Sequence, residues 1–211
     1  QYGYTEQYDG TSWTVKNPLN TPRYGIGSAG TTTAGLAVAG GIESAPYETG
    51  VTEEFDGTSW AESGDLTDTR GTGVGCGTQT AALYSGGNYG TIISPTWQNS
   101  DSNEEYNGTS WSEKNDLNTG RNYSCQFSAG STTAALIAGG APFATGAQKY
   151  TEQWNGTSWT EVADLTNAKQ GVGGAGLTGT LGIAFGGGPP SSTATEHWEA
   201  ETLTVKTVTV S

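Results

Sequence analysis

Few residues of this chain are of the types that catalyse reactions, and their spacing does not group them. His197 is the single histidine, and it stands where other copies of an internal repeat carry Gln or Glu. A Ser–His–Asp triad depends on its histidine, and copper-radical oxidation requires several histidine ligands and a modified Tyr–Cys pair. We find neither set in the chain and interpret His197 as a surface residue.

The two cysteines, Cys76 and Cys125, have no spacing typical of a metal site or a disulfide framework. They follow basic residues of the repeat by six and four positions, on strands that we expect to be innermost. We interpret them as small buried apolar side chains. We therefore expect no catalytic residue, no metal, no cofactor and no enzymatic activity.

Three arginines, Arg23, Arg70 and Arg121, are the only ones in the chain. An arginine cluster binds carboxylate substrates in sialidases, which also carry repeated Asp boxes with one residue between Asp and Gly. Here Asp9 and Gly10 are adjacent, and the arginines hold equivalent places in successive repeats. We interpret them as structural residues, each stapling a turn by a hydrogen bond.

Glutamates also recur once or twice in each repeat, and a ring of carboxylates could bind cations. We favour solvent-exposed strand charge instead, because such charge discourages pairing of sheet edges. The glutamates concerned are Glu6, Glu53, Glu54, Glu104, Glu105, Glu152 and Glu196.

Composition limits the class of protein and its partners. The 211 residues include 34 Gly, only 14% are charged, and Met is absent, which favours many short strands joined by turns. The net charge of −13 repels phosphate backbones and anionic lipid, so we expect no nucleic-acid partner. No apolar run approaches 18 residues, so we expect no membrane insertion.

An internal repeat organises the whole chain. The phrase Thr-Glu-Gln-Tyr-Asp-Gly-Thr-Ser-Trp at residues 5–13 recurs three times almost unchanged, and a degraded fifth copy has Trp198 in the aromatic place and Leu203 where Trp is expected. The tryptophans that end the phrase lie 47, 51 and 48 residues apart; they are Trp13, Trp60, Trp111 and Trp159.

A second sequence unit lies between the copies of this phrase and recurs with the same period. It begins at Arg23, Arg70, Arg121 and Lys169, a few residues after a leucine. It ends in a glycine pair, at Gly40–Gly41, Gly86–Gly87, Gly139–Gly140 and Gly186–Gly187. Four markers with one period through the chain indicate a repeat architecture.

Each half of the repeat predicts a hairpin. Asp-Gly or Asn-Gly favours a two-residue type I′ turn, which would place Tyr8 opposite Thr11 and diagonal to Trp13, on the same face. The second hairpin joins a glycine-rich strand, residues 24–29, to a short apolar strand, residues 36–39. Two hairpins in about 48 residues match one four-stranded propeller blade.

The Gly-Gly that ends the second strand, the following aromatic and the fourth-strand Trp resemble the kelch-type β-propeller. The resemblance covers nearly all of residues 1–205, although the aromatic and Trp are closer together than in the usual kelch pattern. The repeated phrase also resembles tandem repeats in virion proteins of marine bacteriophages. That resemblance implies a virion or extracellular location.

The count of hairpins predicts an incomplete ring. Five Trp hairpins and four glycine hairpins give 18 strands, that is, four full blades plus an extra N-terminal hairpin, a partial fifth blade. The single domain, residues 1–211, then contains repeats at 5–51, 52–102, 103–150 and 151–194 and a terminal copy at 195–211. Because the chain opens on Gln1 close to a repeat, we expect it to be a processed or excised piece.

The repeats diverge in one class of loop, between the glycine pair and the next Trp hairpin. Propeller topology places these loops on one face, together with the links between blades. Variable loops on a rigid scaffold commonly carry binding, and exposed aromatics could stack on sugars or anchor a protein. Packing against the blades is the alternative for each of the loop aromatics, which are Trp97, Tyr89, Tyr47 and Phe143.

Two functions fit these observations. The first is a binding module of a particle or cell surface that recognises a glycan or protein receptor through the loop face. The second is a structural or assembly protein of a virion or filament, whose N-terminal hairpin contacts other subunits, including copies of itself as a homo-oligomer.

Overall fold

The computed structural model describes residues 3–44, 47–89, 98–127, 131–141, 146–188 and 193–200. All regular elements in these ranges are β-strands, and no helix occurs among them. Three sheets have four antiparallel strands each. Blade I contains β3 (Gly27–Thr31), β4 (Ala34–Gly41), β5 (Glu48–Phe55) and β6 (Trp60–Glu62). Blade II contains β7 (Val74–Thr78), β8 (Ala81–Ser85), β11 (Asn103–Tyr106) and β12 (Trp111–Lys114). Blade III contains β13 (Cys125–Phe127), β14 (Ala135–Ala138), β15 (Thr151–Trp154) and β16 (Trp159–Val162).

Three further groups complete the strand inventory of the described residues. Blade IV contains β17 (Gln170–Thr178), β18 (Leu181–Gly188) and β19 (Thr195–Glu199). The N-terminal hairpin contains β1 (Thr5–Tyr8) and β2 (Trp13–Lys16). A short ribbon in the loop of blade II contains β9 (Asn88–Tyr89) and β10 (Gln98–Asn99).

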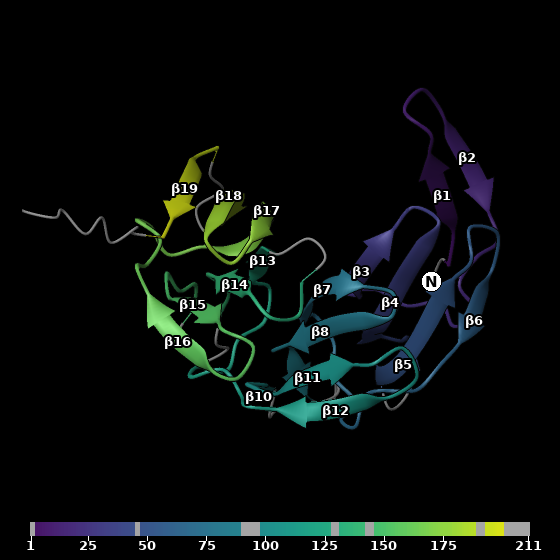
Figure 1. Cartoon of the computed structure of the whole chain (residues 1–211), viewed down its shortest axis with the longest axis horizontal. Helices are drawn as coiled ribbons and strands as arrows, with labels where there is room; N and C mark the ends of the chain where they lie inside the picture. The colour runs from purple at the N-terminus through teal and green to yellow at the C-terminus, as the bar shows by residue number, and fades with distance from the viewer. Residues whose placement is uncertain are drawn as a thin grey trace, which may run out of the picture.

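The four sheets are arranged as a four-bladed β-propeller, which confirms the predicted all-β fold. Their innermost strands β3, β7, β13 and β17 contact one another in chain order around the hub. Figure 1 shows the blades along an open arc, with the N-terminal hairpin at one end and blade IV at the other. The hairpin pairs only with itself in the described residues, as the hairpin count predicts.

The described strands account for the expected count except at the end of the chain. Seventeen of the 18 expected strands are present, and the place of the last, around Leu203, lies outside the described residues. The ribbon of β9 and β10 was not expected, because it lies in the longest of the variable loops.

The predicted two-residue turn of the Trp hairpins is wrong. Tyr8 pairs directly with Trp13, so four residues form the loop. The reason is the Asp9 carboxylate, whose Oδ1 accepts hydrogen bonds from the backbone N–H of Thr11 and Ser12 at 2.8 Å each. This local cap widens the turn. The aromatic pair still shares a face, with ring centroids 5.2 Å apart.

The glycine pair is shifted by one residue in the first repeat. Strand register aligns Leu36 with Leu136, so Ala39 and Gly40 take the place of Gly139 and Gly140. Ala39 adopts φ 58° there, a conformation that usually requires glycine. The following glycine is required for space as well, since a Cβ on Gly140 would lie 2.7 Å from a backbone oxygen.

Neighbouring blades are joined by the fourth-strand tryptophan. The Trp111 indole N–H of blade II donates to Thr52 Oγ1 of blade I at 2.9 Å, and Trp111 is buried in the core between them. Trp60 of blade I donates in the same way to Thr5 of the N-terminal hairpin, at 2.9 Å. Trp159 of blade III packs against Cys76 and Leu83 of blade II, but its Nε1 is buried without a hydrogen-bond partner.

Each of blades I to III also contains a buried ion pair between its arginine and its third strand. Arg23 pairs with Glu53 at 2.6 Å, Arg70 with Glu104 at 2.5 Å, and Arg121 with Glu152. The expectation that these glutamates are exposed is wrong, because all three are fully buried. Each carboxylate also accepts backbone N–H groups of the link that enters its blade, such as those of Asn20 and Thr21 at Glu53.

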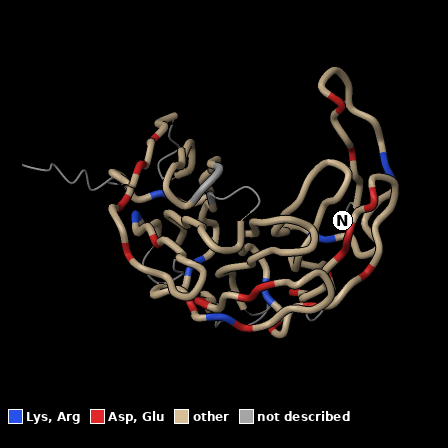
Figure 2. Tube along the Cα trace, in the orientation of Figure 1, with Lys and Arg blue, Asp and Glu red and all other residues tan. Residues whose placement is uncertain are grey.

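The remaining charge is spread over the arc and is mostly acidic (Figure 2). In the described residues, no helix is long and apolar enough to cross a membrane.

We predict that Arg70→Met destabilises the protein by about 3–5 kcal/mol, because Glu104 is left charged, buried and unpaired. Urea unfolding measures the loss. The matched control is Lys114→Met, whose pair with Glu105 is partly exposed and should contribute less than about 1 kcal/mol. Equal losses in the two variants would show that burial of the pair does not decide its contribution.

Candidate functional site

The variable loops and the links between blades meet at one end of the blades, here called the loop face. The residue after each basic marker forms an antiparallel bridge with the residue after the glycine pair: Tyr24 with Gly41, Gly71 with Asn88 and Asn122 with Ala141. The start of each inner strand therefore lies beside the start of each variable loop.

The structure describes two of the four predicted loop aromatics. Tyr47 is half-buried at φ 71° and closes a turn in which its backbone N–H donates to Ser44 O at 2.9 Å. Tyr89 is half-buried on β9, and its hydroxyl lies 2.6 Å from Ser102 Oγ and 2.9 Å from Ser100 Oγ. The Tyr89 hydroxyl thus secures its own loop. Trp97 and Phe143 lie outside the described residues.

A buried carboxyl group at the boundary of blades I and II is the most unusual feature of the loop face. Glu48, at the start of β5, accepts a hydrogen bond at Oε1 from Asn88 Nδ2 at 3.0 Å. Its Oε2 is buried without a hydrogen-bond partner. Burial raises the pKa of this carboxyl to about 7, although the Asn88 hydrogen bond opposes the shift.

Glycine at position 71 makes room for this carboxyl group. A Cβ on Gly71 would lie 2.1 Å from Glu48 Oε2, so any side chain there would displace it. Asn88 also contacts the hydroxyl of Thr72 through its Oδ1. Residues of two blades therefore hold Glu48 in one place.

Two exposed tyrosines lie in this part of the loop face: Tyr24 is within electrostatic range of Glu48, and Tyr123 is within range of Tyr24. Tyr24 and Tyr123 are each 49% exposed. Burial first, then the nearby Glu48 carboxylate and Tyr123, raise the pKa of Tyr24. Tyr24, Tyr123 and Glu48 are here called the hub cluster.

A backbone ladder fixes the position of Tyr123 in the hub cluster. The N–H of Thr72 donates to Gly25 O at 2.9 Å, that of Tyr123 to Thr72 O at 3.3 Å, and that of Gly171 to Tyr123 O at 2.8 Å. All four residues have φ between 50° and 62°. The ladder joins the four blades, and it holds two non-glycine residues in a conformation that costs free energy.

Further buried polar groups lie near this ladder. Both side-chain atoms of the Asn122 amide and the hydroxyl of Ser124 are buried without a hydrogen-bond partner. Such groups are uncommon in folded proteins, because burial without a partner costs free energy. A cavity of about 220 Å³ between the four inner strands begins next to them and is lined by Ser124.

The chemistry available here is recognition through polar and aromatic contacts. No group of three or more metal-binding side chains occurs in the described residues. Both cysteines are buried, as expected, and burial raises the pKa of the Cys125 thiol to about 12, which keeps it protonated. His197 is exposed on β19, as expected.

Comparison with known proteins gives no family assignment: no family model and no curated protein matches the chain. The candidate site therefore depends on geometry.

Sequence reasoning missed the whole hub cluster. Tyr24 and Tyr123 follow the basic markers in places where other repeats have Gly71, Thr72 or Gly171, so a position-by-position comparison of repeats could have singled them out. No sequence signal marks Glu48, because its burial depends on a glycine of the next blade.

We predict that Glu48→Gln removes a pH-dependent loss of stability. The folded-state pKa is raised above the unfolded value, so the folded state is favoured by protonation at low pH and loses this contribution as pH rises through about 7. The wild-type melting temperature should therefore fall between pH 5 and pH 8 by more than that of Glu48→Gln. Exposed Glu199→Gln is the control, and equal pH dependence in all three proteins would contradict the assignment.

Proposed function

We propose that this protein is a non-catalytic binding module, with a kelch-like repeat, that recognises a glycan or protein receptor through its loop face. The hub cluster carries the proposal, since it combines a buried carboxyl group with an unpartnered oxygen and two half-exposed tyrosines. Carboxylates accept hydrogen bonds from sugar hydroxyls, and tyrosine rings offer flat apolar faces that can stack on sugars.

A particle-borne, extracellular setting is part of this proposal. The resemblance of the repeated phrase to virion repeats supports it, and the acidic composition fits a partner that is neither nucleic acid nor an anionic membrane. The variable loops, with Tyr47, Tyr89, Trp97 and Phe143, would then extend recognition outward from the hub cluster.

We predict that Tyr24→Ala and Tyr123→Ala each weaken binding to immobilised glycans at least tenfold, because each removes an exposed aromatic face of the hub cluster. A glycan array followed by titration of the strongest glycan measures the change. Leu181→Ala is the control, since Leu181 is equally exposed but lies in the turn at the other end of blade IV.

Unchanged binding in both tyrosine variants would overturn the assignment to the hub cluster. Loss of binding only in Trp97→Ala would move the site outward into the variable loops. If the wild-type protein binds no glycan on the array, the receptor is a protein or the binding function is wrong, and cell-surface binding in the same variants separates these two outcomes.

The second candidate function is assembly, and one observation favours it. In the N-terminal hairpin Trp13 is 67% and Tyr8 46% exposed, whereas the equivalent Trp111 and Tyr106 of blade II are 6% and 1% exposed. An exposed aromatic pair in a repeated structural unit that is buried elsewhere in the chain is typical of a surface that another subunit covers.

We predict that the full chain self-associates with rising concentration and that Trp13→Ala weakens this association at least tenfold. Sedimentation velocity over a range of concentrations measures it. Val15→Ala, another exposed apolar change on β2, should have a smaller effect. A wild-type protein that stays monomeric at high concentration would contradict the assembly function.

A further inference from the structure

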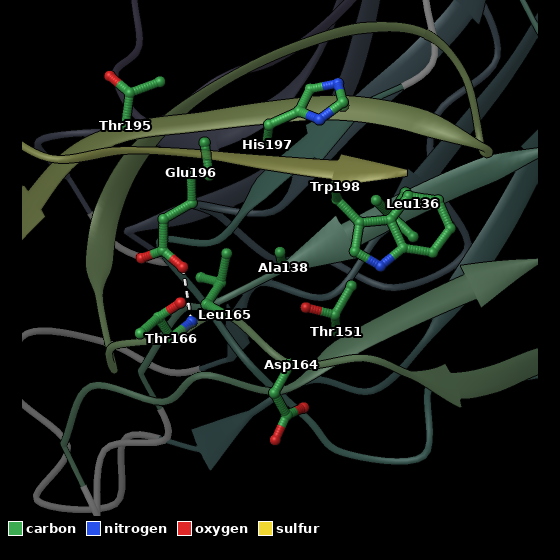
Figure 3. Close-up of a pocket in the computed structure, with 12 residues that line it drawn as sticks. Leu136, Ala138, Thr151, Asp164, Leu165, Thr166, Thr195, Glu196, His197 and Trp198 are labelled. Atoms are coloured by element: carbon green, nitrogen blue, oxygen red, sulfur yellow. Dashed lines mark hydrogen bonds between the residues drawn. The ribbon is translucent and has the colours of Figure 1, made fainter. Parts of the chain in front are cut away.

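A cavity of about 320 Å³ lies between blades III and IV (Figure 3). Blade III contributes two side chains of β14, one of β15 and the link to blade IV, and β18 and β19 of blade IV form the other wall. The residues that decide its chemistry are Leu136, Thr151, Leu165, Gly182, Ala184 and Trp198.

Strand register shows what occupies the same place between blades I and II. Thr151 is equivalent to Thr52 of blade I. Between blades I and II, Thr52 receives the indole N–H of Trp111, and Tyr84 packs beside it in the same core cluster. The cavity is therefore the place of a fourth-strand tryptophan.

Among the described residues, the interface of blades III and IV lacks the tyrosine and the tryptophan that fill this place between blades I and II. Ala184 stands in the place of Tyr84, and Gly182 in that of Ala82. In the sequence Leu203 replaces the tryptophan, and its side chain is smaller than an indole and has no N–H to donate. The only hydrogen bond recorded for the Thr151 hydroxyl in the described residues is a long one, 3.5 Å to Lys149 O.

The missing group is present at the other end of the chain. Trp13 and Tyr8 form the same tilted aromatic pair as Tyr106 and Trp111, with ring centroids 5.2 Å and 5.0 Å apart. Trp13 is nevertheless exposed, because the strands that would precede it in a blade are absent from the described residues. In the described residues, Trp13 is exposed in the N-terminal hairpin, and a cavity lies in the place of a fourth-strand tryptophan beside blade IV. Figure 1 shows this hairpin and blade IV at opposite ends of the arc.

We propose that the cavity between blades III and IV binds the N-terminal hairpin of a second copy of this chain, which takes the place of β19 and inserts Trp13 over Thr151. This inference rests on the assembly function proposed above and specifies its contact surface.

The sequences of the two strands fit this exchange position by position. Residues 5–8 read Thr-Glu-Gln-Tyr, and residues 195–198 read Thr-Glu-His-Trp. Glu196 accepts the N–H of Thr166 and pairs with Lys169 at 2.9 Å. Glu6 of the incoming hairpin keeps this buried contact.

The exchange preserves strand pairing and adds a strand to blade IV. β18 of one copy gives up its backbone hydrogen bonds with β19 and forms equivalent ones with β1 of the second copy. β2 of the second copy then becomes the fourth strand of the blade. The indole moves from solvent into a cavity bounded by Leu136 and Leu165, where Thr151 can accept its N–H. Because the contact joins unlike ends of two copies, it is heterologous and builds chains or rings.

A second copy is favoured over the chain's own hairpin. β1 is held against blade I by the Trp60–Thr5 hydrogen bond and by Gln7 Nε2, which donates to Thr32 O at 2.7 Å. These contacts keep the hairpin at the end of the arc away from blade IV (Figure 1). The hairpin of another molecule can approach blade IV without breaking them.

Disulfide trapping between two full-length single-cysteine variants tests the exchange. His197 lies opposite Ile183 in blade IV, so Gln7 of an incoming hairpin would lie there instead. Opposed residues of adjacent strands lie close enough for a disulfide. We expect a mixture of Gln7→Cys and Ile183→Cys to form a mixed disulfide dimer under mild oxidation, since the native cysteines are buried.

Two matched variants keep the test specific. Trp13→Ala added to Gln7→Cys should reduce the yield of dimer at least tenfold. The double variant Ile183→Cys with His197→Cys locks β19 in place, so it should form a disulfide within one chain and lose self-association.

Three outcomes would overturn the exchange. If the protein self-associates but the mixture forms no mixed disulfide dimer, the assembly function is retained and this contact surface is wrong. A cross-linked monomer of Gln7→Cys with Ile183→Cys, with no dimer in the mixture, would assign the cavity to the chain's own hairpin. Absence of both association and trapping would remove the assembly function as well.

Discussion

The indole of each fourth-strand tryptophan is the contact on which the propeller depends. It packs in the space between two sheets. Trp111 also donates its N–H to Thr52 of the preceding blade, whereas Trp159 packs against blade II with no hydrogen-bond partner for its Nε1. No blade hides its own apolar face, so every blade needs a neighbour on both sides. In the described residues, this packing is incomplete at the two ends of the row: Trp13 is exposed at one end, and a cavity lies over Thr151 at the other.

A second constraint acts within each blade and fixes the links on the loop face. The buried pairs such as Arg70 with Glu104 hold the entering link against the third strand, and the carboxylates accept backbone N–H groups that have no strand partner. Because this frame is rigid, the loop face can hold groups that would otherwise be unfavourable. Glu48 keeps a buried carboxyl group in contact with Asn88, and Tyr123 keeps a left-handed backbone conformation. We propose that these features serve recognition at the loop face.

The two proposed functions use different parts of the molecule and are compatible. The hub cluster lies at the loop face, whereas the exchange of hairpins uses the sides of the first and last units of the arc. Head-to-tail copies would carry their loop faces in a regular series, so many weak sites would act together on a surface that presents repeated ligands.

The sequence by itself determined the propeller, because the period of about 48 residues, the four strands in each period and the places of Trp, Arg and Gly-Gly are all local patterns. It also determined the surplus hairpin, by simple counting. The tertiary structure decided what depends on neighbours. The glutamates at 53, 104 and 152 are buried because an arginine reaches them from another part of the blade, and Tyr8 faces Trp13 because the Asp9 side chain caps the loop. The hub cluster and the cavity over Thr151 each lie between two blades. A strand pattern shows which side chains share a face, and only the packing of one blade on the next shows what that face meets.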